Sequence, residues 1–172
     1  MTKSFACSVL IVIAAALIES TILANLYILP VVPDLILISC IYLSLLNGRT
    51  YGQLNGFVSG LTLDFITGVP LGFNCILRTV ISYIYGFFST HIVITGIIVP
   101  VLTVSIGTLL KYVLVWLISL FYTAINPASI LSFDFLFELI ANTVLAPFVF
   151  NFLSFFSGTL SIHKDEDIEK YV

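Results

Sequence analysis

Six apolar runs, separated by short breaks rich in proline, glycine or asparagine, cover almost the entire sequence. The runs are Phe5–Leu29, Asp34–Leu46, Gly52–Thr67, Leu71–Ser89, about Pro100–Tyr122 and Phe133–Phe156. The chain is 60% hydrophobic and 9% charged, whereas typical soluble domains contain about 25% charged residues. We therefore predict an all-α integral membrane protein with six transmembrane helices in residues 1–160, followed by a polar cytoplasmic tail, 161–172.

The second run is short, and its first residue is acidic. Asp34 follows Pro33 and is expected to cap the N-terminus of the second helix. Two alternatives remain for this run: it extends to Asn47 and Gly48, or it enters the membrane only part-way.

Basic residues orient the six expected spans. Lys3, Arg49, Lys164 and Lys170 all fall on one side if both termini face the cytoplasm, and the loops near 30–34, 68–71 and 123–133 contain no lysine or arginine. Loops on the cytoplasmic side carry an excess of these residues. We expect a multi-pass protein of a bacterial inner membrane with both termini in the cytoplasm.

Glycines recur at every fourth position between Gly48 and Gly72, except where Asp64 interrupts them. Residues four apart share one face of a helix, and small residues let transmembrane helices approach closely. The pattern predicts a helix-packing ridge against an internal helix or a partner's helix; a functional site around Asp64 is the alternative. The members of this ridge are Gly52, Gly56, Gly60, Gly68 and Gly72.

Five ionisable residues fall inside the expected spans and form a predicted intramembrane polar cluster: Glu19, Asp64, Arg78, Lys111 and Glu138. Charged groups are costly in a bilayer, so each is a candidate functional residue. Counting back from the outer loops at the helical rise places all five roughly 5 to 16 Å deep, in the outer half of the membrane. We predict an ion pair between Asp64 and Arg78, because a short turn joins their helices.

Small and polar residues with four-residue spacing accompany these charges. The expected inward-facing stripes are Asn74, Arg78, Ser82 and Gly86; Thr103, Gly107 and Lys111; and Asp134, Glu138 and Asn142. The charges could be structural pairs that fix helix register, could line a small-ligand cavity open to the outside, or could form a surface that recognises a partner's helix.

No enzyme signature is present: the sequence contains no nucleophile elbow, no HExxH motif and no phosphate-binding loop. Cys7, Cys40 and Cys75 lie in apolar runs and are interpreted as small core residues. His91 and His163 are interpreted as interfacial or solvated. We expect no catalytic residue, no cofactor, no metal site and no nucleic-acid binding.

The middle of the chain resembles the family of the rod shape-determining protein MreD. The resemblance covers about Pro33 to Gly86 and is carried by Pro33-Asp34-Leu35, Tyr42-Leu43, Gly52, Gly56-Phe57, Gly60-Leu61, Asp64, Gly68 and Leu71-Gly72. Arg78 is not part of the family pattern.

The resemblance implies a non-catalytic membrane scaffold of the bacterial cell-elongation (Rod) complex, which helps to control cell shape and lateral peptidoglycan synthesis. The implied direct partner is an MreC-like bitopic protein. The implied indirect partners are MreB, RodA and a class B penicillin-binding transpeptidase.

The same family is similar to the substrate-binding S components of energy-coupling factor transporters, which are small six-span proteins with an outward-facing ligand site. The outer-half polar cluster fits that function, so an S-component-like subunit of a small-molecule (vitamin) transporter is the alternative. Binding loops that would identify a vitamin are not recognisable in the sequence.

Overall fold

The computed structural model describes residues 2–23, 31–120 and 132–162, and these residues contain helices but no strands. The elements are α1 (Thr2–Ile18), the π-helical turn η1 (Glu19–Leu23), α2 (Leu35–Thr67), α3 (Phe73–Phe87), α4 (Ile98–Ser119), α5 (Phe133–Phe155) and α6 (Ser157–Leu160). The expected all-α class is therefore confirmed.

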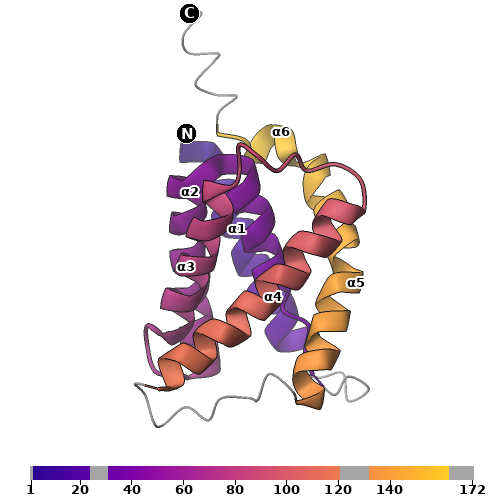
Figure 1. Ribbon diagram of the computed structural model, residues 1–172. Coiled ribbons are helices and arrows are strands. Elements are labelled where there is room, and N and C mark those ends of the chain that lie inside the picture. Colours follow the sequence, from indigo (N-terminus) through magenta and orange to yellow (C-terminus); the bar gives the residue numbers. More distant parts are fainter. Residues whose placement is uncertain (1, 24–30, 121–131, 163–172) are drawn as a thin grey trace, which may run out of the picture.

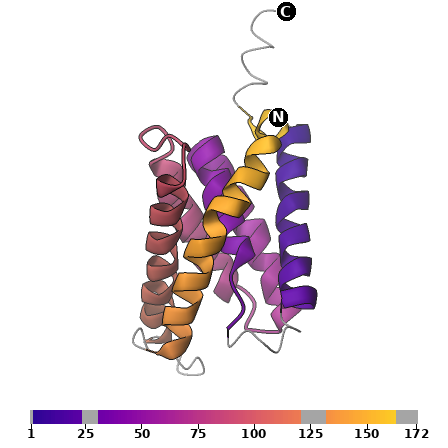
Figure 2. The same ribbon diagram turned by 90° about the vertical axis from the view of Figure 1, so that its right-hand side faces the viewer.

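The helices form a bundle in which α3 and α5 run lengthwise, and α4 crosses obliquely in front of the others in Figure 1 (Figures 1 and 2). Three helical segments among the described residues, Ser4–Thr21, Ile98–Ser119 and Phe133–Phe155, are long and apolar enough to cross a membrane. The beginning of α1 and the short α6 lie at the same end of the bundle in Figure 1. We refer to this end as the terminal end.

Helix α2 changes direction at Gly48, which divides it into two halves. Gly48 has φ 78° and ψ −169°, a conformation that glycine adopts without the steric cost of a side chain. The halves Leu35–Asn47 and Arg49–Thr67 correspond to the second and third expected spans. The first half, at 1.5 Å per residue, is about 20 Å long, shorter than a hydrocarbon core of about 30 Å.

The first half of α2 is the core of the bundle. Its side chains from Ile36 to Leu45 are all buried, and α2 contacts each of the other helices. A helix that is apolar all round is suited to such a central position. The Tyr42 ring meets Phe150 of α5 edge-on at 5.2 Å between centroids.

The packed part of the chain extends to Ile162, within the segment expected as a polar tail. Leu160 and Ile162 are fully buried, and the Ile162 backbone N–H donates to Asn47 Oδ1 at 3.0 Å. This bond joins the end of the described chain to the residue next to the Gly48 bend. Residues 24–29 of the first expected span, and residues 121–122 of the fifth, lie outside the described residues.

Candidate functional site: a charge network inside the bundle

Asp34 lies inside the bundle at the N-terminus of α2. Figure 2 shows the segment before α2 running inward from the end opposite the terminal end. The Asp34 side chain is 3% exposed and its Oδ1 accepts from the Leu37 N–H at 2.8 Å. Its predicted role as helix cap is thus confirmed, but the cap is buried among the other helices.

Every backbone donor at this buried helix start has a partner. The Asp34 N–H donates to Asn142 Oδ1 at 2.8 Å, and the Ile36 N–H donates to Glu19 Oε2 at 3.2 Å. The N–H groups of Leu35 and Ile38 donate to the carbonyls of Pro33 and Asp34. A helix start can lie away from water only when its free N–H groups are satisfied in this way.

Two cations converge on the Asp34 carboxylate from different helices. Arg78 Nη2 of α3 lies 2.9 Å from Oδ1, and Lys111 Nζ of α4 lies 2.8 Å from Oδ2. Among the described residues, Arg78 pairs with Asp34 and not with Asp64. The predicted Asp64–Arg78 pair is wrong, because sequence adjacency across a turn does not decide which way each side chain points around its helix.

Glu138 of α5 completes the set. Lys111 Nζ lies 2.6 Å from Glu138 Oε1, and Tyr112 Oη donates to Glu138 Oε2 at 2.8 Å. Asn142 Nδ2 lies 3.2 Å from Thr108 Oγ1 and 3.4 Å from Glu138 Oε1. We call Asp34, Arg78, Lys111 and Glu138 the charge network. It joins α2, α3, α4 and α5, and its two carboxylates balance its two cations.

The structure brings together four of the five ionisable residues predicted to cluster. Arg78, Lys111 and Glu138 belong to the charge network, and Glu19 approaches it through the Ile36 N–H. Asp34, the central member, was predicted only as a cap because residue counting placed it at the outer surface. The shortness of its helix is the signal that could have placed it deeper.

Asp64 lies apart from the charge network and caps α3. Its carboxylate accepts from the backbone N–H groups of Gly72, Asn74 and Cys75 at 2.8, 2.9 and 3.3 Å. These are donors at the start of α3 that have no partner within the helix. Asp64 thus has no partner in the charge network among the described contacts, and it fixes the turn between α2 and α3.

The glycine ridge packs inside the chain. A Cβ added at Gly56 would lie 2.5 Å from the Arg78 carbonyl oxygen, and one at Gly60 would lie 2.4 Å from Cys75 Cα, both on α3. A Cβ at Gly52 would lie 2.7 Å from Ser44 Oγ in the first half of α2. Among the alternatives left open, the structure thus shows an internal contact for these three glycines.

Gly68 and Gly72 do not continue this ridge. Their φ values are 68° and 100°, and a Cβ at either would have no atom within 4 Å. Both positions belong to the turn that leads from α2 into α3, so the requirement there is backbone conformation and not close packing. For these two glycines the structure contradicts close packing against an internal helix.

Cavities of the bundle are lined by residues outside the charge network. One measures about 500 Å³ and lies between α3 and α4, and another measures about 630 Å³ and lies between α4 and α5 near the terminal end. A third, of about 180 Å³, lies between α1, α2 and α5. No residue of the charge network lines any of them.

No group of three or more metal-ligating side chains occurs in the part of the chain that the structure describes. Cys7, Cys40 and Cys75 are free thiols. What the network can do chemically is hold helices together: three of its four members are buried, and each member lies on a different element.

The family model of the rod shape-determining protein MreD matches residues 1–156. The chain belongs to the MreD family. No curated protein and no solved structure matches it. Family membership and the three long apolar helices identify a membrane protein of rod-shape determination. The match also extends the resemblance seen between Pro33 and Gly86 to nearly the whole packed part of this MreD chain.

Proposed function

We propose that this MreD-family chain is a non-catalytic scaffold of the bacterial cell-elongation complex, seated in the inner membrane and bound to an MreC-like bitopic protein. The observation that carries the proposal is the family match over residues 1–156. Through that partner the scaffold would act with MreB, RodA and a class B penicillin-binding transpeptidase on cell shape and lateral peptidoglycan synthesis.

The fold supports a six-span arrangement with cytoplasmic termini. Counting the two halves of α2 separately gives six long segments, and the bundle begins and ends at the terminal end (Figure 1). Arg49 follows the Gly48 bend, and Asn47 before it bonds Ile162 near α6, so Arg49 also belongs to this end. Placing it in the cytoplasm satisfies the positive-inside rule.

The charge network supports a scaffold because its charges are matched with one another. Breaking a buried ion pair costs much more stability than breaking an exposed one, so the network favours one relative placement of four helices. It leaves large apolar side chains, among them Leu136, Ile140 and Val144 of α5, facing outward. A partner's single span would meet these apolar faces, since Gly56 and Gly60 already contact α3.

A transporter subunit similar to an S component is the second candidate. Its support is the position of the charge network toward the end opposite the termini, which would face outward in the proposed topology. The pairing of Asp34 with Arg78 and Lys111 weighs against it, because a ligand would have to displace these contacts.

A pull-down in a gentle detergent tests the two candidates together. The tagged protein is recovered from its native membrane and its companions are identified by mass spectrometry. Recovery of a bitopic protein with a periplasmic coiled coil, together with RodA or the transpeptidase, is the expected result. Recovery of a transmembrane coupling subunit with two ATPases would instead identify a transporter.

A matched control separates specific recovery from membrane carry-over. An unrelated six-span protein with the same tag, expressed at the same level, should recover none of these companions. Recovery of the same proteins by the control would remove the support for the scaffold.

A further inference from the structure

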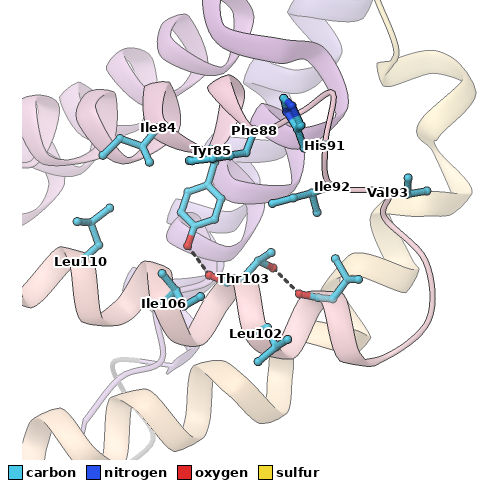
Figure 3. A pocket seen from close by; sticks show the side chains of 11 residues that line it. Ile84, Tyr85, Phe88, His91, Ile92, Val93, Leu102, Thr103, Ile106 and Leu110 are labelled. Carbon is cyan, nitrogen blue, oxygen red and sulfur yellow. Dashed lines mark hydrogen bonds between the residues drawn. The ribbon is translucent and has the colours of Figure 1, made fainter.

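A long apolar groove of about 500 Å³ runs between α3 and α4 (Figure 3). From α4 it is lined over three turns by side chains between Val99 and Leu110, and from α3 by Ile84 and Tyr85. Phe88, His91, Ile92 and Val93 close its end at the terminal end of the bundle. At the helical rise the lined part of α4 is about 16 Å long.

The polar groups in the groove are already satisfied. Tyr85 Oη donates to the Thr103 carbonyl at 2.6 Å, which bridges the two helices across the groove (Figure 3). Thr103 Oγ1 donates to the Val99 carbonyl at 2.8 Å. Apart from His91 at the closed end, the remaining wall offers hydrocarbon, so the part of an occupant that lies between the helices gains by burying apolar surface.

Basic side chains lie beside the closed end of the groove. Exposed His91 lines it, and exposed Arg49 places its Cζ 4.1 Å from the centre of the Phe87 ring. Phe87 in turn contacts the groove residue Phe88, with 5.3 Å between ring centroids. An arginine at this level of a membrane attracts anionic headgroups and contributes about 1 kcal/mol near the surface, and the His91 ring adds a hydrogen-bonding group beside it.

We propose that this groove holds one acyl chain of an anionic glycerophospholipid, with the headgroup phosphate beside Arg49 and His91. A partner's helix does not fit as well: a cylinder about 10 Å across over three turns occupies roughly 1,200 Å³, more than twice the groove. The inference rests on membrane placement with Arg49 at the bilayer surface. It does not depend on which partner the scaffold binds.

Native mass spectrometry of the full chain, released from nanodiscs, tests the proposal. The probes are phosphatidylglycerol and phosphatidylcholine with identical acyl chains, mixed in equal amounts. Wild type should retain one lipid, predominantly phosphatidylglycerol. Ile106→Trp places a large side chain in the groove and should lower retention about tenfold, the effect of losing about two buried methylene groups.

Ile140→Trp is the matched control, because Ile140 is as exposed as Ile106 (62% and 58%) but lies on α5 away from the groove. It should retain lipid like the wild type. Leu102→Trp, on the same groove wall, provides a second test if Ile106→Trp does not fold. Equal retention by the groove variants and the control would overturn the acyl-chain site.

Arg49→Gln combined with His91→Gln tests the headgroup. The double variant should still retain one lipid but lose the preference for phosphatidylglycerol. An unchanged preference would overturn the assignment of the phosphate to these two side chains. Failure of the partner pull-down would leave all these outcomes unchanged, so the two proposals fail separately.

Discussion

The contact between α2 and α3 and the contact between this pair and α4–α5 are built on different principles. Along α2 and α3, Gly56 and Gly60 bring backbones within van der Waals distance. Toward α4 and α5, Asp34 pairs with Lys111 of α4, which also pairs with Glu138 of α5, and an apolar groove lies between α3 and α4. Shape specifies the first interface, whereas charge pairing specifies the second.

Removing Asp34 should have the largest effect, because one carboxylate serves two cations. We expect Asp34→Ala to lower the free energy of unfolding by about 3–5 kcal/mol, the usual cost of leaving a buried charge unpaired. Titration with SDS in mixed micelles measures it. Arg78→Ala added to Asp34→Ala should recover part of the loss. A double variant as unstable as the sum of the single variants would refute the pairing.

A methyl group at the contact between Gly60 and α3 should lower the free energy of unfolding by less than Asp34→Ala does. Gly60→Ala would place Cβ 2.4 Å from Cys75 Cα, so the two backbones must separate. The expected loss is about 1–3 kcal/mol, typical of overpacking. Gly158→Ala in α6, where a Cβ meets nothing within 4 Å, is the control. Equal stability of the two variants in the same titration would contradict a shape-specified interface.

The Asp64 cap should have a smaller and independent effect. Asp64→Ala removes the acceptor of three backbone donors and should cost about 1–2 kcal/mol, within the range of N-cap substitutions. Because Asp64 and Arg78 share no partner among the described contacts, their substitutions should be additive. Partial rescue of Asp64→Ala by Arg78→Ala would restore the pairing expected from the sequence.

The smallest expected effect belongs to a neutral hydrogen bond between α4 and α5. Ser105 Oγ lies 2.9 Å from Thr143 Oγ1. Such bonds between membrane helices average about 0.6 kcal/mol, so Ser105→Ala should change stability by about that amount. A double-mutant cycle with Thr143→Ala measures the coupling. A coupling as large as that of Asp34 with Lys111 would mean that a neutral hydrogen bond holds these helices as strongly as charge pairing does.

Periodicity predicted most of the fold. The start of α5 at Phe133 and the end of α2 at Thr67 follow from the apolar runs, the inward faces of Arg78, Gly107 and Glu138 follow from spacing, and the structure confirms them. The exposed Asp134 is an exception within its stripe, because it lies in the first turn of α5. Four-residue spacing identifies a common face but not what that face meets.

The pairing of charges could not be predicted in the same way. Residue counting measures depth only if each span starts at the surface, and α2 starts inside the bundle. Asp34 therefore pairs with Arg78 and Lys111, while Asp64 accepts hydrogen bonds from the nearby N–H groups at the start of α3. The pairing of carboxylates with cations depends on helix rotation and on competing backbone donors. Residue spacing determines neither.

The buried start of α2 also has a consequence for how the chain enters its membrane during synthesis. The first half, with Asp34 at its inner end, is too short to be inserted alone as a span of about 20 apolar residues. We expect the Leu35–Thr67 segment to insert as one helical hairpin, bent at Gly48 and held on the cytoplasmic side by Arg49. Asp34 would then lack its ion-pair partners, Arg78 and Lys111, until α3 and α4 have been synthesised.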